Sequence, residues 1–147
     1  MGVTAGTVAS RIVIAAEPET TVASAARLMR DNHVGALVVI EASGAREKAI
    51  GVVTDRDLVV EVIAMGLDPG TITVSDIMAT DLATIGDDES PYAAAAAMRA
   101  HGVRRLLVID PAGRAVGILA MDDLMDLLAT QLGEVAQAVH AERDRER

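Results

Sequence analysis

"GVVTDRDL" at residues 51–58 is written a second time, with changes, as "GILAMDDL" at 117–124. Both copies begin with a glycine, continue through two apolar residues and reach an aspartate at their seventh position. The fourth position is Thr54 in the first copy and Ala120 in the second. A phrase of this length that recurs once predicts an internal duplication in which the two copies have diverged at the fourth position.

The duplication extends upstream of this phrase. "DNHVGALVVIE" at 31–41 aligns with "AHGVRRLLVID" at 100–110, an offset of 69 residues. "TTVASAARLM" at 20–29 keeps that offset over "ESPYAAAAAM" at 89–98. The offset of the opening phrase is 66 because the first copy carries the longer loop, "EASGAREK" against "DPAGRA". The two copies are therefore related along most of their length.

The length of the repeat predicts two small domains rather than the units of a solenoid. At the start of the copies we align "TVAS" at 7–10 with "TVSD" at 73–76, an offset of 66. The predicted organisation is a first domain at 7–66, a second at 67–128 that includes a linker at 67–80, and a helical, then charged tail at 129–147.

Each copy predicts an α+β unit with the order strand, helix, strand, strand, helix. Thr21 can cap the first helix of copy one, and Ser90 followed by Pro91 is a good helix start in copy two. The apolar positions of the first helix in copy one are Val22, Ala25, Ala26 and Met29. The predicted strands that follow are 37–40 and 50–53 in copy one and 106–109 and 116–119 in copy two.

The helix that follows each aspartate turn is predicted to be amphipathic. In the first copy its apolar residues are Leu58, Val62 and Ile63, and the helix is predicted to end near Gly66. In the second copy they are Leu124, Leu127 and Leu128, and the helix is predicted to continue through Leu132, Val135 and Val139. Exposed apolar stripes of this kind mark association surfaces. We therefore expect a twofold-symmetric homodimer formed through the faces Leu58/Val62 and Leu124/Leu128, with Leu132 and Val135 beyond them.

The composition narrows the class of protein. The chain has 147 residues, 51% of them hydrophobic, with Tyr92 as its one aromatic residue, no cysteine and a net charge of −9. This charge argues against nucleic acid or an anionic membrane as a partner. The absence of cysteine fits a reducing compartment, and neither a signal peptide nor a membrane span is apparent. We expect a soluble, cytoplasmic protein.

Together, these phrases make the repeat resemble a cystathionine β-synthase (CBS) domain, and the tandem pair resembles a Bateman module. The matching phrases are "VGALVVIE", "VRRLLVID", "GVVTDRDL", "GILAMDDL" and the linking "TVSDIM". The resemblance covers roughly residues 7–128 and implies two domains related by pseudo-twofold symmetry, with two clefts between them. It also implies a non-catalytic sensor whose clefts bind adenosine compounds and which reports to a partner protein that the sequence does not identify.

The first aspartate turn suits a nucleoside for physical reasons. Thr54 is expected where a strand ends and a helix begins, a place where unpaired backbone N–H groups face outward. Asp57 lies one helical turn further on, and an ionised carboxylate can accept hydrogen bonds from both ribose hydroxyls. Gly51, Thr54 and Asp57 meet the family's motif in full. The alternative is that Thr54 and Asp57 only cap the helix.

The resemblance places the rest of this cleft on the other copy. Thr54 and Asp57 would face Thr84 and the run Val103, Arg104 and Arg105. The valine would pack on the adenine and the two guanidinium groups would bind phosphate, although they could also be a solvated surface pair. Paired arginines favour AMP, ADP or ATP over S-adenosylmethionine. In the mirror-image cleft these positions are Ala120, Asp123, Ala15, Gly35 and Ala36, so the resemblance implies one working cleft.

Other functions have little support in the sequence. His33, His101 and His140 show no close spacing of metal ligands, and we expect no metal and no required cofactor. No catalytic set of nucleophile and base is apparent, so we expect no enzyme. The rival hypothesis is a ligand-free module that serves dimerisation or docking onto a partner.

Overall fold

The computed structural model describes residues 2–11, 13–44 and 46–145. The chain divides into two compact units. We call the unit made of Ile12–Leu82 and Ala112–Ala115 the first unit, and the unit made of Met1–Arg11, Ala83–Pro111 and Val116–Arg147 the second unit. Each unit contains one copy of the predicted strand, helix, strand, strand, helix order, so the α+β fold class is confirmed.

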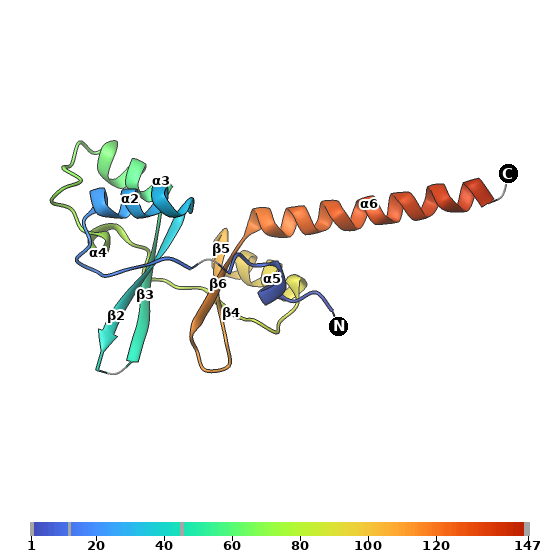
Figure 1. Ribbon diagram of the computed structural model, residues 1–147, viewed down its shortest axis with the longest axis horizontal. Helices are drawn as coiled ribbons and strands as arrows, with labels where there is room; N and C mark the ends of the chain where they lie inside the picture. Colours follow the sequence, from blue (N-terminus) through green and yellow to red (C-terminus); the bar gives the residue numbers. More distant parts are fainter. Residues whose placement is uncertain (1, 12, 45, 146–147) are drawn as a thin grey trace. The chain divides into compact units, whose positions relative to one another are not determined.

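The first unit is built on a three-stranded sheet with the order β1-β2-β3 (Figure 1). β1 runs parallel to β2, and β2 is antiparallel to β3 with a register shift between Val39 and Ile40. The strands β1, β2 and β3 are Ala15–Ala16, Ala36–Ser43 and Arg46–Thr54, and the helices α2, α3, η1 and α4 are Val22–Asn32, Asp55–Asp57, Leu58–Ile63 and Val74–Ile77.

The second unit repeats this plan with the sheet order β4-β5-β6. β4 runs parallel to β5, as β1 does to β2. The strands β4, β5 and β6 are Thr84–Gly86, Arg105–Ile109 and Ala115–Ala120, and the helices α1, α5 and α6 are Ala5–Val8, Pro91–His101 and Met121–Arg145.

The predicted helix starts are correct in both units. Thr21 caps α2 by accepting from the backbone N–H of Ser24 at 3.2 Å, and Ser90 caps α5 by accepting from that of Ala93 at 3.1 Å. Val22, Ala25 and Met29 are buried as predicted, but Ala26 is exposed. A helix of this length buries only one narrow face against a sheet, and Ala26 lies beside that face rather than on it.

The two hydrophobic cores are built from equivalent positions of the repeat. Ala25, Met29, Leu37 and Val39 in the first core have counterparts in the second at an offset of 69, namely Ala94, Met98, Leu106 and Val108. The same offset relates Val74 to Ala5, because each is the buried first residue of a short helix. The predicted alignment of 7–10 with 73–76 was therefore wrong by three residues, because one shared "TV" pair outweighed the pattern of burial.

Each unit includes a short segment from outside its own copy of the repeat. The segment before the first copy belongs to the second unit, and the segment before the second copy belongs to the first unit. The segment 4–10 belongs to the second unit, where Ala5 N–H donates to Glu89 O at 2.7 Å and Ser10 pairs with Ile118. In the first unit, the N–H of Val74 donates to Thr20 O at 2.8 Å and Ala79 pairs with Val52. The compact units therefore divide the chain differently from the repeats predicted at 7–66 and 67–128, whose boundaries stay a prediction.

The first glycine of the repeated phrase is needed where these segments pass. A Cβ on Gly117 would lie 2.9 Å from the carbonyl oxygen of Ser10, and a Cβ on Gly51 would collide with the Met78 side chain and lie 3.1 Å from Ala79 O. Real Cβ atoms essentially never come as close to another atom as at Gly117, and the distance to Ala79 O at Gly51 is tighter than most real Cβ contacts. The glycine is therefore explained by a backbone crossing within each unit.

The helices after the two aspartate turns differ in length. In the first unit the helix from Asp55 ends at Ile63, with i to i−5 bonds such as Ala64 N–H to Val59 O at 2.8 Å, and Gly66 has a φ of 68°. In the second unit α6 is continuous over 25 residues. Among the described residues, no helix combines the length and apolar character needed to cross a bilayer.

Only some of the residues that were expected to form association faces are exposed. Leu58, Val62 and Leu124 are buried in their own units, because they point toward the sheet of the same unit. Leu128, Leu132 and Val135 are exposed as expected. The exposed apolar residues of the first unit's last helix are instead Val59, Val60 and Ile63.

We expect Gly117→Ala to lower the free energy of unfolding by about 1–3 kcal/mol, because its methyl group would displace the backbone at Ser10. Thermal and denaturant unfolding would measure the change. Gly133→Ala is the matched control, since nothing lies within 4 Å of that position in α6, and its added helix propensity should not destabilise the protein. Equal stability of Gly117→Ala and the unmutated chain would contradict the crossing.

Candidate functional site

Thr54 and Asp57 form a reciprocal capping box at the end of β3. The backbone N–H of Thr54 donates to Oδ2 of Asp57 at 2.8 Å, and Oγ1 of Thr54 accepts from the N–H of Asp57 at 3.3 Å. Both residues are half-buried. Thr54 and Asp57 therefore do cap the helix, as the alternative interpretation predicted. A carboxylate has acceptor capacity beyond one bond, so the cap leaves room for a hydroxyl donor.

The second unit keeps half of this box. The N–H of Ala120 donates to Oδ2 of Asp123 at 2.8 Å, the same bond that Thr54 makes with Asp57. Ala120 has no hydroxyl with which to accept from Asp123 in return. The aspartate is therefore explained in both copies by helix capping. The hydroxyl of Thr54 is the feature that distinguishes the first turn from the second.

Thr84 and Val103 both belong to the second unit, Thr84 at the start of β4 and Val103 between α5 and β5. Thr84 is the exposed first residue of β4 and stands opposite Leu107 of β5. Val103 is half-buried, and its N–H donates to Met98 O at 3.0 Å, which fixes the backbone between α5 and β5. The equivalent of Thr84 in the first unit is Ala15, at the start of β1.

Arg104 and Arg105 are exposed cations at the start of β5. The guanidinium of Arg104 lies 4.0 Å from Oδ1 of Asp122, with 74% of the arginine side chain exposed. An exposed pair at this distance is worth little, since water screens it and both side chains are free to move. Arg104 is therefore free to exchange Asp122 for another anion.

The structure brings Arg104 next to the turn of its own unit. The N–H of Met121 donates to Arg104 O at 2.8 Å, and in the first unit the N–H of Asp55 donates to Gly35 O at 2.9 Å. Thr54 and Asp57 belong to the first unit, whereas Thr84, Val103, Arg104 and Arg105 belong to the second. A single cleft built from both groups stays a prediction.

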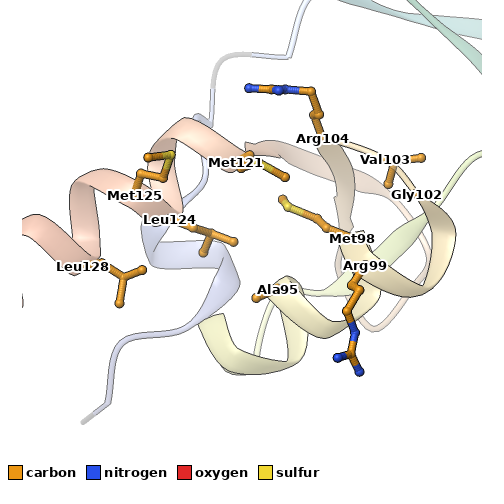
Figure 2. A pocket seen from close by; sticks show the side chains of 10 residues that line it. All are labelled: Ala95, Met98, Arg99, Gly102, Val103, Arg104, Met121, Leu124, Met125 and Leu128. Carbon is orange, nitrogen blue, oxygen red and sulfur yellow. The ribbon is translucent and has the colours of Figure 1, made fainter.

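An apolar groove of about 480 Å³ lies in the second unit between α5 and the start of α6. Figure 2 shows Met98, Met121 and Leu124 gathered around it, while the guanidinium groups of Arg99 and Arg104 extend away from it. This groove was not predicted from the sequence. The signal that could have indicated it is the set of methionines on α5 and α6, because methionine side chains adapt to irregular apolar surfaces.

A second hollow, of about 560 Å³, lies in the first unit beside Ala15. Its acidic lining would repel a phosphate, which agrees with the loss of the threonine and arginines from the equivalent positions. The carboxylates that line it are Glu17, Glu19, Glu41 and Glu47. Among the described residues, no three histidines, aspartates or glutamates are grouped so that they could hold a metal ion.

Comparison with known proteins identifies the family. The model of the CBS domain matches residues 5–64 and again residues 74–130. The chain belongs to the CBS domain family and carries two copies of the domain. Such pairs are regulatory modules in many proteins.

Two relatives illustrate how far the likeness extends. The CBS domain-containing protein YhcV of Bacillus subtilis is 36% identical over 112 residues, covering 76% of each chain. The uncharacterized protein MK0525 of Methanopyrus kandleri is 33% identical over 125 residues, which are 85% of this chain. This chain spans 62% of the length of MK0525.

Solved structures share the fold. Hypoxic Response Protein I, solved with two coordinated zinc ions, is 30% identical with a TM-score of 0.66, covering 85% of this chain and 98% of that one. The hexameric CBS-CP12 protein of bloom-forming cyanobacteria is 28% identical with a TM-score of 0.74, covering 85% and 67%. The CBS pair of MJ0100, in complex with 5-methylthioadenosine and S-adenosyl-L-methionine, is 22% identical with a TM-score of 0.74, covering 88% and 98%, and supports the fold alone.

We expect Asp57→Ala and Asp123→Ala to destabilise the protein by similar amounts, about 0.5–2 kcal/mol each, because each removes the acceptor of one cap bond. Denaturant unfolding would measure both. Asp122→Ala is the matched control, since its ion pair with Arg104 is exposed and its loss should cost less than about 1 kcal/mol. An Asp123→Ala variant as stable as the control would show that the cap bond contributes nothing.

Proposed function

We propose that the chain is a non-catalytic regulatory module that binds one adenosine phosphate, AMP, ADP or ATP. The observation that carries the proposal is the asymmetry between the two units. The first turn has a hydroxyl that the second lacks, and the second unit has two exposed arginines where the first has Gly35 and Ala36. Divergence of both halves of one site is expected if that site alone binds ligand.

The ribose is assigned to Asp57 and Thr54. The cap bond already holds the carboxylate of Asp57 at 2.8 Å from the N–H of Thr54, so its position does not have to be fixed when the ligand binds. A preorganised carboxylate can accept from the 2′ and 3′ hydroxyls, and the hydroxyl of Thr54 adds a donor for a nearby ligand oxygen.

The phosphate is assigned to Arg104 and Arg105. Their exposure and the weak pairing of Arg104 with Asp122 leave the guanidinium groups available to a dianion. Arginine suits this role because its planar group donates two parallel hydrogen bonds to phosphate. Thr84 and Val103 complete the proposed site, the valine against the adenine ring.

The competing function is a ligand-free module for self-association or docking onto a partner. The cap bonds support it, because helix capping alone accounts for Asp57 and Asp123. The exposed apolar residues Val59 and Ile63 in the first unit and Leu128 in the second support association in either case. We propose a homodimer as the functional form; the hexameric assembly of a structural relative supports self-association in general and not this number of copies.

Binding of AMP should be visible as thermal stabilisation. At a hundred times its dissociation constant a ligand that binds only the folded state adds about 2.7 kcal/mol. For a chain of this size the melting temperature should rise by about 5–10 °C. A thermal-shift screen of the purified protein against adenine and guanine nucleotides would measure this rise. No shift with any nucleotide would favour the ligand-free module.

Two substitutions separate the ribose from the phosphate. Asp57→Ala should weaken adenosine and AMP alike, whereas Arg104→Ala should weaken AMP by about one to two decades and leave adenosine almost unchanged. Isothermal titration calorimetry would measure both affinities. Asp123→Ala is the control for Asp57→Ala, because it loses the same cap bond in the unit without the threonine.

Three results would contradict these assignments. Equal losses for adenosine and AMP in the Arg104→Ala variant would refute its role at the phosphate. Weakened binding in the Asp123→Ala variant would move the site to the second turn, beside which Arg104 lies. A stoichiometry near two nucleotides per chain would show that both turns bind.

A further inference from the structure

The C-terminal part of α6 lies outside the packing of its own unit. Every residue from Leu128 to Arg145 is exposed, although the helix is continuous from Met121. Figure 1 shows this part extending beyond the sheet and α5 of the second unit. Most helical stability in proteins comes from packing of an apolar face, so a bare helix of this length needs a partner.

The exposed apolar residues of α6 form one continuous seam. Leu132 and Val135 are 70% and 62% exposed, and neighbouring seam residues follow at alternating spacings of four and three. This is the spacing of the a and d positions of a coiled coil, and Gly133, which directly follows the a position Leu132, falls outside the seam. The exposed members of the seam are Met125, Leu128, Leu132, Val135 and Val139, and the half-buried Met121, which also packs against the core of its own unit, begins it.

The position of Glu142 distinguishes the two possible directions of a paired helix. Glu142 continues the seam three residues after Val139, at a d position. In a parallel dimer, the seam would end with two glutamates facing each other, which is unfavourable. In an antiparallel dimer, Met125 faces Val135 of the second copy, Leu128 faces its Leu132 and Met121 faces its Val139. Glu142 then lies beyond the overlap, in water.

The helix dipoles also favour the antiparallel direction. Antiparallel pairing sets the two dipoles in opposition, whereas parallel pairing would place their like ends side by side. The charged side chains of the last turn add no preference, because Glu142 and Asp144 stand beside Arg143 and Arg145 there and the turn lies beyond the overlap.

The groove of the second unit continues this seam. Met121, Leu124, Met125 and Leu128 line the groove together with residues of α5. In the antiparallel arrangement, Val135 and Val139 of the second copy reach Met125 and Met121, at the mouth of the groove (Figure 2). Both copies offer the same groove and the same helix end, as a twofold interface requires.

We propose that α6 pairs with α6 of a second copy of this chain as an antiparallel coiled coil over residues 121–139. The inference rests on the proposed self-association and gives it a surface, a direction and a register. The groove between α5 and α6 receives the end of the second helix, so the interface is continuous from the body of one copy to the body of the other.

Cysteine crosslinking tests the direction, since the chain has no cysteine of its own. Met125→Cys and Val135→Cys are each prepared alone and together, and covalent dimers are quantified after mild oxidation. In the antiparallel register the double variant should crosslink, because residue 125 faces residue 135 of the second copy. The single variants should not, because identical positions are then about 15 Å apart. Gln137→Cys, on the outward face, is the control for random collision.

The outcomes are distinct. Crosslinking of each single variant would show a parallel seam, and crosslinking of Gln137→Cys as fast as the double variant would show collision, and either overturns the proposal. No crosslink in any variant overturns it as well, whether the seam binds another protein or nothing.

A second measurement separates this proposal from the proposed function. Leu132→Asp should halve the mass measured by light scattering, while Gln137→Asp, its outward-facing control, should not. AMP affinity is measured on the same variants. A dimer that persists in Leu132→Asp overturns the seam but leaves self-association intact, and failure to bind AMP bears only on the proposed function.

Discussion

The structure of each unit depends on a backbone crossing at the first glycine of the repeated phrase. In the second unit Ser10 and Ile118 exchange two hydrogen bonds, of 3.1 and 3.0 Å, beside Gly117. In the first unit Val52 and Ala79 do the same, at 3.0 and 2.9 Å, beside Gly51. These bonds cover part of the outer strand of each sheet, whose free N–H and C=O groups would otherwise remain available to another chain.

The strand after the crossing delivers the backbone to the aspartate turn. β3 ends at Thr54 and β6 at Ala120, three residues after each glycine, and a helix begins at the next residue. The cap bonds that Asp57 and Asp123 accept from the backbone N–H groups of Thr54 and Ala120 stabilise the start of that helix. The same aspartate can therefore be a structural cap in both copies and a ligand acceptor in one. Capping alone accounts for an aspartate in both turns, and the ligand role of Asp57 stays a proposal.

Local patterns in the sequence predicted the local structure well. The caps at Thr21 and Ser90 and the order of the elements in each copy are confirmed, because capping chemistry and apolar periodicity act over a few residues. The grouping of the N-terminal segment with the second copy was not predicted, since it depends on pairing between Ser10 and Ile118, which no local pattern encodes. The predicted exposure of Leu58 and Leu124 failed for a related reason. An amphipathic helix has one apolar face, and the sequence does not say whether a sheet of the same unit already covers it.

The charge distribution limits which ligand the proposed site can select. A chain with a net charge of −9 repels a nucleotide at long range, so binding has to rest on short-range contacts with exposed guanidinium groups. Arg104 already has Asp122 as a neighbour at 4.0 Å, so a phosphate gains only the difference between the two anions. A dianionic phosphate that accepts two parallel hydrogen bonds interacts more strongly with the guanidinium group than a single distant carboxylate does. A neutral or cationic group at the same place interacts less strongly. The glutamates beside Ala15 impose the opposite preference on the first unit. In the proposed site, selectivity for a phosphorylated adenosine, and for one site rather than two, would therefore come from the local charges and not from the net charge of the chain.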